Sequence, residues 1–295
     1  MTHKSGFVNI VGNPNVGKST LMNRLVGERI SIITSKAQTT RHRILGIVNT
    51  ESMQIVYSDT PGILQPNYKL QQSMLSFSES ALDDADVLLY MTDTVEKTDK
   101  NDVFLHRVQK AECPVLVLIN KIDLTDQHAL EQLVLSWHEL LPQAEIYPIA
   151  ARSGFNVDVV QKRIEALIPP SPPYFDKDAL TDRPARFFVA EIIREKILLY
   201  YQKEIPYAVE VVVEQFVETD TLIRIKSLII VERESQKGII IGHRGQAMKK
   251  VGIMARRDLE HFFNKKIHLE TFVKVEDDWR NRDTLLRQYG YEISE

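Results

Sequence analysis

The 295-residue sequence contains a single cysteine, Cys113. One cysteine cannot form a disulfide within the chain or build a thiolate metal cage, so disulfide scaffolds and cysteine-based metal sites are excluded. No apolar run approaches the roughly 20 residues that a membrane-spanning helix needs. The first residues, MTHKSGFVNIVG, also lack the apolar stretch of a secretion signal. These absences predict a soluble protein of the cytoplasm.

The chain also lacks a large excess of charge of one sign, because its formal net charge is only −3. Hydrophobic residues make up 43% of it. Disordered chains combine low hydrophobicity with a large net charge, so this chain is expected to fold. Its length allows two domains with a core each.

Proline is concentrated in one place, with five of the twelve prolines between positions 169 and 184. Such a segment breaks helices and strands, and we interpret it as an interdomain linker stiffened by polyproline geometry. The sequence is therefore divided into a first domain over 1–168, a linker over 169–184 and a second domain over 185–295.

Before the linker, short apolar runs alternate with longer amphipathic segments. Strands are expected over 7–11, 44–49, 53–58, 87–92, 115–120 and 145–149. Helices are expected near 18–27, 68–84, 101–111, 127–140 and 156–167. Several strands are apolar on both faces, which predicts an α/β domain whose mostly parallel six-stranded sheet carries helices on both faces. Strands 44–49 and 53–58 are joined too tightly for a crossover, so we expect one antiparallel pair at an edge.

After the linker, the pattern changes to a smaller α+β domain. Its expected order is a helix over 186–203, strands over 207–217 and 221–234, a helix over 246–262, a strand over 267–275 and a short helical tail. One segment, 237–266, carries eight basic and two acidic residues, although the whole chain is slightly acidic. Such a basic cluster favours contact with nucleic acid.

The segment GNPNVGKS follows an apolar strand and opens a helix. In that context a Gly-x4-Gly-Lys-Ser pattern predicts a phosphate loop, whose backbone N–H groups converge on phosphate oxygens at a helix N-terminus. We expect Lys18 to lie against the β- and γ-phosphates and Ser19 to bind Mg²⁺. The predicted nucleotide-binding residues here are Gly12, Asn13, Pro14, Asn15, Val16, Gly17, Lys18, Ser19 and Thr20.

A second motif, Asp-Thr-Pro-Gly, ends the strand MQIVYS. Asp59 at a strand tip can reach the metal through water, and the Gly62 amide can sense a γ-phosphate. Thr60 and Pro61 complete this predicted part of the site.

A third motif, Asn120-Lys121-Ile122-Asp123, ends the strand VLVLIN and predicts the choice of base. The Asp123 carboxylate can accept two hydrogen bonds from N1–H and the 2-amino group of guanine. Adenine lacks that donor pair and would leave the carboxylate desolvated and unpaired. The motif therefore predicts a guanine nucleotide, GTP or GDP, rather than the ATP of a P-loop kinase or ATPase.

In the basic segment, Gly242-His243-Arg244-Gly245 lies between an apolar run and an amphipathic helix, and it resembles the loop of a bacterial-type KH domain. The two glycines allow close approach of a nucleic-acid backbone, and unpaired bases would lie in the groove beside the helix. Single-stranded RNA is the expected ligand. The predicted contacts are Ile241, Gly242, His243, Arg244, Gly245, Lys249, Lys250, Arg256 and Arg257. Met248, Ile253 and Met254 are expected in the core, and the tail over 279–289 either extends the RNA surface or packs against the domain.

The order of the three nucleotide motifs resembles the translation-factor-like GTPases, and KAQTTRHRILG with the second half resembles the Era-like family of bacterial ribosome-assembly GTPases. This resemblance covers nearly the whole chain. It implies a first-switch threonine that binds Mg²⁺, and we favour Thr40 over Thr39. It places a base-contacting loop at Ala150, Ala151 and Arg152, where the family usually has a serine before the alanine, and so we expect a less rigid loop.

The resemblance further implies catalysis by Lys18, Thr40 and Gly62, and it places Asn15 where related enzymes hold K⁺. Ile63 stands where Ras-like enzymes carry a water-orienting glutamine, so intrinsic hydrolysis should be slow. An RNA-binding or chaperone protein that binds GTP with negligible turnover therefore remains the alternative. As partners, the resemblance implies the 3′ end of small-subunit ribosomal RNA during assembly of that subunit and loose association with the inner membrane. We also expect a monomer.

Overall fold

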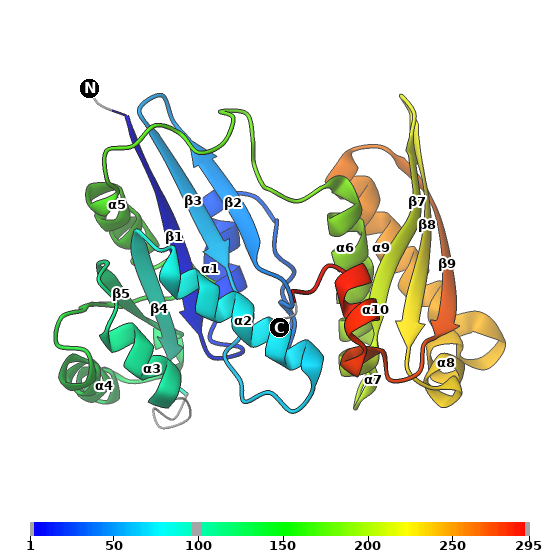
Figure 1. Ribbon diagram of the computed structural model, residues 1–295, viewed down its shortest axis with the longest axis horizontal. Coiled ribbons are helices and arrows are strands. Elements are labelled where there is room, and N and C mark those ends of the chain that lie inside the picture. The colour runs from blue at the N-terminus through cyan, green and yellow to red at the C-terminus, as the bar shows by residue number, and fades with distance from the viewer. Residues whose placement is uncertain (1–2, 96–101, 293–295) are drawn as a thin grey trace. The chain divides into compact units, whose positions relative to one another are not determined.

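A computed structural model describes residues 3–95 and 102–292 of the chain. The chain forms two compact units, with the boundary between Asp182 and Arg183 (Figure 1). None of the helices within these described ranges is long and apolar enough to cross a membrane.

The first unit is built on a six-stranded sheet in the order β2-β3-β1-β4-β5-β6. Its strands are β1 (Lys4–Gly12), β2 (Ile44–Asn49), β3 (Met53–Asp59), β4 (Val87–Asp93), β5 (Val115–Asn120) and β6 (Glu145–Pro148). Its helices are α1 (Lys18–Val26), α2 (Lys69–Asp83), α3 (Asp102–Gln109), α4 (Gln127–Leu140), α5 (Val157–Leu167) and the 3₁₀ turn η1 (Ile122–Leu124). Position 101, where the predicted third helix begins, lies outside the described residues.

The sheet confirms the predicted α/β architecture. Only β2 pairs antiparallel, with β3 at the edge of the sheet, and the other pairings are parallel. Every residue of β4 and β5 is buried, as a strand covered on both faces requires. Residues of α2, α3 and α4 pack on one face in a shared core, and Figure 1 shows α2 in front of the sheet and α1 behind it.

Parallel pairing brings the carboxyl ends of four strands to one edge. Ile10 of β1 lies opposite Asp59 of β3, and Asp93 of β4 lies opposite Asn120 of β5. Ligand sites of open α/β sheets form at this edge, and all three nucleotide motifs follow strands that end there.

The proline-rich segment packs along the sheet as far as residue 182. The Gln54 side chain accepts hydrogen bonds from the backbone N–H groups of Tyr174 and Phe175, at 2.7 and 3.0 Å. Farther on, the Ile47 N–H donates to the Leu180 carbonyl at 2.8 Å. The Ile47 bond covers part of the β2 edge, which would otherwise present unpaired backbone groups.

The second unit has a three-stranded sheet in the order β7-β8-β9, in which β7 and β8 are antiparallel and β8 and β9 parallel. Its strands are β7 (Glu210–Glu218), β8 (Leu222–Val231) and β9 (Lys266–Val275). Its helices are α6 (Ala185–Tyr200), α7 (Ile205–Ala208), α8 (Glu234–Ile241), α9 (Gln246–Phe263) and α10 (Asp283–Gln288), with 3₁₀ turns η2 (His243–Gly245) and η3 (Trp279–Asn281). Aliphatic residues of α6, α9 and one sheet face form its core.

Two helices of this unit were missed by the sequence prediction, the short α7, which occupies the start of the strand expected over 207–217, and α8. We expected the second strand to run to residue 234, but β8 ends at Val231 and α8 follows. Gly238 and the run Ile239–Ile241 have low helix propensity, which hides the helix at the level of local sequence. Burial of Ile240 in the domain core outweighs that propensity.

Candidate functional site

The phosphate loop connects β1 to α1 and depends on two glycines. Gly12 has φ 146°, and a Cβ there would lie 2.1 Å from the Met91 carbonyl oxygen. Gly17 has φ 106°, and a Cβ there would lie 2.3 Å from the Asn120 amide nitrogen. Neither position can accept a side chain, so the loop follows a path open only to glycine.

Lys18, the first residue of α1, folds back under this loop. Its Nζ donates to the carbonyl oxygens of Gly12 and Asn13, both at 2.8 Å. The ammonium group is thereby buried at the N-terminus of a helix, where two positive contributions act on the same small volume. Such a site favours a phosphate group.

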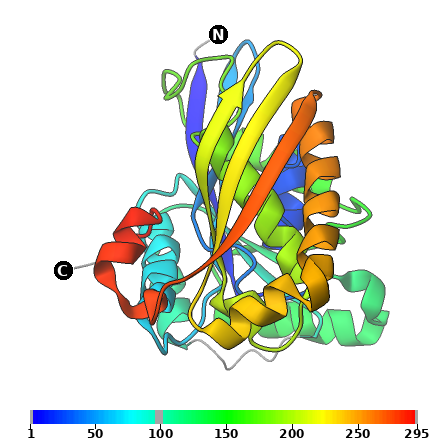
Figure 2. The same cartoon turned by 90° about the vertical axis from the view of Figure 1, so that its right-hand side faces the viewer.

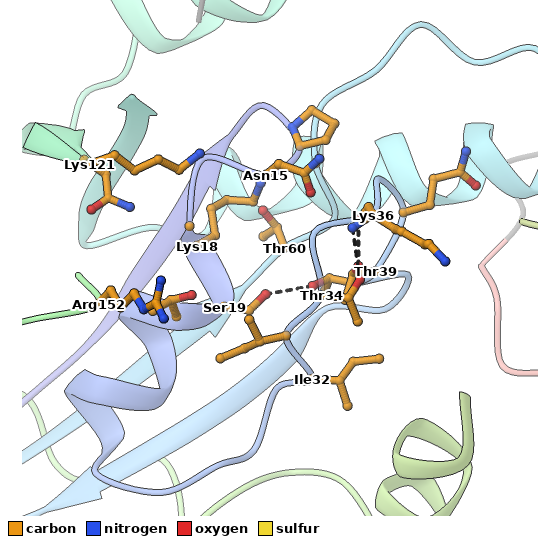
Figure 3. A pocket seen from close by; sticks show the side chains of 18 of the residues that line it. Asn15, Lys18, Ser19, Ile32, Thr34, Lys36, Thr39, Thr60, Lys121 and Arg152 are labelled. Atoms are coloured by element: carbon orange, nitrogen blue, oxygen red, sulfur yellow. Dashed lines mark hydrogen bonds between the residues drawn. The ribbon is translucent and has the colours of Figure 1, made fainter. Parts of the chain in front are cut away.

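A cavity of about 680 Å³ opens beside the loop. It is lined by Pro14, Asn15, Gly17, Lys18, Ser19, Thr20, Ile32, Ile33, Thr34, Lys36, Gln38, Thr39, Thr40, Thr60, Gly62, Asn120, Lys121, Asp123, Leu124 and Arg152. Figure 3 shows the pocket and labels ten of the residues that line it. Residues of all three predicted motifs and of the segment 32–40 therefore border one space.

Seven residues predicted for this site are not among those lining the cavity. These are Gly12, Asn13, Val16, Asp59, Pro61, Ala150 and Ala151. Sequence reasoning missed Ile32, Ile33, Thr34, Lys36, Gln38 and Leu124. Apart from Leu124 of η1, the missed residues belong to an irregular loop, whose course has no periodic signal in the sequence.

Three oxygen-bearing side chains lie close together beside the phosphate loop, two of them at the border of the cavity. The hydroxyl oxygens of Ser19 and Thr40 are 2.9 Å apart, and the Thr40 hydroxyl donates to Asp59 Oδ2 at 3.4 Å. Thr39 points elsewhere: its hydroxyl lies 2.6 Å from that of Thr34 and donates to the Lys36 carbonyl at 2.7 Å. Of the two candidate threonines, Thr40 is the one beside Ser19.

Asp59 is fully buried, and its Oδ1 accepts no hydrogen bond from any residue in the described ranges. Burial raises the pKa of this carboxyl group, and the neighbouring Ser19 hydroxyl and Lys18 ammonium oppose the shift. An unpaired buried carboxylate oxygen is costly unless a cation or water satisfies it. Hydroxyl and carboxylate oxygens are the ligands that Mg²⁺ prefers, so these three residues fit a metal held together with phosphate oxygens.

The segment after β3 touches the phosphate loop directly. A Cβ at Gly62 would lie 2.6 Å from the Cα of Pro14. The Ile63 N–H donates to the Gly12 carbonyl at 3.1 Å, and its side chain is buried in the core between the sheet and α2. Ile63 therefore faces away from the cavity and cannot orient a water there.

Asn120 joins the phosphate loop to the loop that would contact the base. Its amide nitrogen donates to the Val16 carbonyl at 2.7 Å, and its amide oxygen accepts from the Ala151 N–H at 2.8 Å. Arg24 of α1, which sequence reasoning missed, donates to the carbonyl oxygens of Ala151 and Arg152, both at 2.8 Å. Arg24 thus holds the loop in which the usual serine is missing.

Lys121 and Asp123 border the same end of the cavity. Lys121 adopts a left-handed conformation with φ 61°, and its Nζ lies 2.6 Å from Asp93 Oδ2. Asp123 is exposed, which leaves its carboxylate available to a ligand.

In the second unit, the Gly242–Gly245 segment forms a tight turn between α8 and α9. Gly242, Arg244 and Gly245 have φ values of 69°, 51° and 74°, and a Cβ at Gly242 would lie 2.6 Å from that of Ala247. His243 and Arg244 are exposed at the tip. The turn thereby presents the His243 and Arg244 side chains between two glycines that have positive φ values.

Beside this turn, a groove of about 530 Å³ runs between α9 and β9, which lie next to each other in Figure 2. It is lined by Ile241, Gly245, Met248, Lys249, Gly252, Ile253, Arg256, Leu269, Thr271, Phe272 and Val273. Of the predicted RNA contacts, Ile241, Gly245, Lys249 and Arg256 line it, whereas Lys250 and Arg257 are exposed outside it.

The expected core position of Ile253 is wrong. Its side chain is 51% exposed, and it borders the groove together with the half-buried Met248. The helical period alone does not distinguish a stripe that faces a core from one that faces a groove.

The tail packs against its own domain. Trp279 is fully buried and its indole N–H donates to the Ala208 carbonyl at 3.0 Å. Arg280 pairs with Glu232, with a contact of 2.8 Å from Nε. Of the two interpretations of this segment, these contacts favour packing.

No group of three or more His, Cys, Asp or Glu side chains capable of holding a metal ion occurs in the described part of the chain. A metal at the nucleotide site would therefore depend on hydroxyl groups, one carboxylate and the phosphates.

Comparison with known proteins agrees with both sites. Residues 7–121 match the family described as "50S ribosome-binding GTPase", and residues 204–280 match the KH domain family. The chain is 45% identical over 291 residues to GTPase Era of Geotalea uraniireducens, with 98% of each chain covered. It is 42% identical over 291 residues to GTPase Era of Staphylococcus haemolyticus, covering 98% of this chain and 97% of the relative.

Two solved structures of Era are similar over nearly the whole chain. One is Era in complex with MgGDPNP and nucleotides 1506–1542 of 16S ribosomal RNA, at a TM-score of 0.94 and 40% identity, covering 99% of this chain and 100% of that one. The other is a variant of Aquifex aeolicus Era bound to GDP·AlF4⁻, at a TM-score of 0.93 and 40% identity, covering 98% and 100%. With a P-loop domain and a KH domain in one chain and relatives at this level of identity, the chain belongs to the Era family of GTPases.

Proposed function

We propose that this chain is a Mg²⁺-dependent GTP switch that binds the 3′ end of small-subunit ribosomal RNA during assembly of that subunit. The proposed GTP binding rests on one observation. Ser19, Thr40 and Asp59 come together beside the phosphate loop, with the Ser19 and Thr40 hydroxyl oxygens 2.9 Å apart. Thr40 belongs to a loop that a bound metal and γ-phosphate can order and that hydrolysis can release.

The residues assigned to GTP are those predicted from the three motifs, namely Gly12 to Thr20, Asp59 to Gly62, Asn120, Lys121 and Asp123, together with Ala150 to Arg152 from the family resemblance. Lys18 neutralises charge on the β- and γ-phosphates, and Ser19, Thr40 and Asp59 hold Mg²⁺ directly or through water. We assign the Gly62 N–H, at the border of the cavity, to the γ-phosphate. Bound Mg²⁺ would supply charge neutralisation on the phosphates as water attacks in line.

Ile63 cannot position the attacking water, so the intrinsic rate of GTP hydrolysis should be slow. Asn15 lines the cavity with φ 67°, and we assign it to a K⁺ ion that neutralises developing charge beside the phosphates. The test is multiple-turnover phosphate release in K⁺ and in Na⁺, with the Asn15→Ala variant beside the wild type. K⁺ stimulation that the variant retains would contradict the role of Asn15.

The second half of the proposal rests on the groove between α9 and β9. Apolar side chains line it, the glycine turn closes one end, and basic residues border it, a combination suited to unpaired bases with their phosphates. The related Era structure contains nucleotides 1506–1542 of 16S ribosomal RNA, and we extend that ligand to this chain.

The RNA assignment is tested by anisotropy with a fluorescein-labelled RNA of that sequence. Gly242→Asp with Gly245→Asp should abolish RNA binding and leave GTP binding intact, because the added carboxylates repel phosphates and block the turn. Crosslinking to total RNA with mapped sites then separates the small-subunit 3′ end from a large-subunit target. Mapping to 23S ribosomal RNA would overturn the proposed subunit.

A second candidate function is an RNA-binding or chaperone protein that binds GTP with negligible turnover. The burial of Ile63 supports this alternative, because the side chain cannot position an attacking water. Phosphate release with and without the RNA distinguishes the two. No turnover under any of these conditions would leave the binding function and remove the catalytic one.

We further propose that the protein acts as a cytoplasmic monomer, with domains over 1–168 and 185–295 and peripheral association with the inner membrane. The exposed basic residues of α9 are suited to anionic lipid as well as to RNA. Light scattering measures the mass of the particle in solution and so tests whether the protein is a monomer. Co-sedimentation with vesicles of phosphatidylglycerol tests the membrane association.

A further inference from the structure

The helix wall of the groove contains a glycine that the protein itself does not require. Gly252 lies in the middle of α9, where glycine destabilises a helix relative to alanine. Its φ is not among the positive values of the chain, so the backbone conformation does not call for glycine. A Cβ placed on it would meet no atom within 4 Å, so no neighbouring group excludes a side chain.

Gly252 is also in the centre of the groove. The α9 residues that line it follow helical spacing, from Gly245 through Met248, Lys249, Gly252 and Ile253 to Arg256. Residues spaced by three and four form one continuous stripe on a helix. The missing side chain at Gly252 therefore leaves a notch halfway along this wall, with Lys249 on one side and Arg256 on the other.

The two cations beside the notch are available to a ligand. Lys249 and Arg256 are exposed, and neither side chain has an ion-pair partner among the described residues. The opposite wall, from β9, presents Leu269, Thr271, Phe272 and Val273 and no charge. Positive charge on one wall alone orients a nucleic-acid strand, with its phosphates toward α9 and its bases toward β9.

We infer that Gly252 is the point at which the sugar–phosphate backbone of a single-stranded RNA touches α9. The absence of a side chain lets the backbone approach the helix between Lys249 and Arg256, so that both cations reach phosphates of the same strand. This inference rests on the proposed RNA function and specifies how the groove accepts its ligand.

The variants that test it are Gly252→Ala and Gly252→Leu, both of which favour the helix and so should fold. Gly238 of α8 supplies the matched control, because a Cβ there also meets nothing within 4 Å and Gly238 does not line the groove. Thermal unfolding should show all three variants at least as stable as the wild type. Binding is measured by anisotropy with fluorescein-labelled RNA of 16S nucleotides 1506–1542.

Overpacking at a close contact predicts a loss of RNA affinity of about tenfold for Gly252→Ala and more for Gly252→Leu. Gly238→Ala should bind as the wild type does. Since the loss is steric, the slope of log Kd against log salt should stay unchanged in Gly252→Ala, whereas Lys249→Gln should reduce it by about 0.7 for one lost phosphate contact.

The outcomes are distinct. Wild-type affinity in both Gly252 variants would overturn the inference while the proposed RNA function stands. An equal loss in Gly238→Ala would also overturn it, because the effect would then come from stiffening the helices. Failure of the wild-type protein to bind the RNA would overturn the proposed function and the inference together.

Discussion

The side chain of Asn120 donates a hydrogen bond to the carbonyl oxygen of Val16 at 2.7 Å, in the buried layer beneath the nucleotide cavity. Val16 belongs to the phosphate loop and Asn120 to the strand end that carries the base motif. The same amide also accepts from the Ala151 N–H. A single side chain therefore sets the position of the phosphate-binding and base-binding loops relative to each other, and a ligand that bridges them depends on this spacing.

We expect Asn120→Ala to weaken GTP and GDP binding equally. The change leaves the buried Val16 carbonyl and Ala151 N–H unpaired, which frees the spacing of the two loops. A bound nucleotide must then restore that spacing, and a cost of about 1.4 kcal/mol for doing so lowers the affinity about tenfold. Titration calorimetry with both nucleotides measures it, and Gln127→Ala on the exposed side of α4 serves as control. A selective loss of GTP alone would contradict this structural role.

Asp123→Asn should shift the preference from guanine to xanthine nucleotides. The carboxylate accepts two hydrogen bonds from guanine, whereas an amide also offers a donor, which suits the 2-oxo group of xanthine. Competition between GTP and XTP measures the ratio. Asp126→Asn is the matched control, because Asp126 caps α4 through a 2.9 Å bond from the Ala129 N–H, and asparagine caps equally well. Unchanged GTP affinity in Asp123→Asn would refute the assignment.

Thr40→Ala should reduce GTP hydrolysis by at least about tenfold through loss of a metal ligand, while GDP affinity stays near the wild-type value. Thr39→Ala provides the comparison, since the Thr39 hydroxyl bonds within its own loop. Single-turnover phosphate release at several Mg²⁺ concentrations separates the two variants. A larger loss in Thr39→Ala than in Thr40→Ala would reverse the assignment.

Asp59→Asn should stabilise the nucleotide-free protein and weaken its response to Mg²⁺-GTP. Folding raises the pKa of Asp59, so the folded state holds this proton more tightly than the unfolded chain does. The folded protein then loses stability as the pH rises through that raised pKa, and the neutral amide avoids the loss.

The expected increase in Tm is about 2–4 °C at pH 8, measured without nucleotide. Because the wild-type carboxyl regains its proton on acidification, the difference should narrow as the pH is lowered. Asp158→Asn on α5 is the control for a general effect of charge. A difference that stays constant with pH would contradict the role of Asp59 burial.

Local sequence patterns predicted much of this fold. The strands apolar on both faces predicted the parallel sheet, and the tight connection between 44–49 and 53–58 predicted the antiparallel edge pair, both of which the structure confirms. These signals succeed because periodicity and loop length act over a few residues. The helix α8 escaped prediction, since its stability comes from burial of Ile240 against distant parts of the second unit.

The sequence by itself determined the class of chemistry here, because the phosphate loop, the base motif and the glycine turn each place backbone groups through neighbours along the chain. Only the tertiary structure decided which of two adjacent threonines lies beside Ser19, that Arg24 holds the loop around Ala151, and that Ile253 and Gly252 face a groove. These depend on contacts between segments far apart in sequence, and their geometry is set by packing, which no local pattern records.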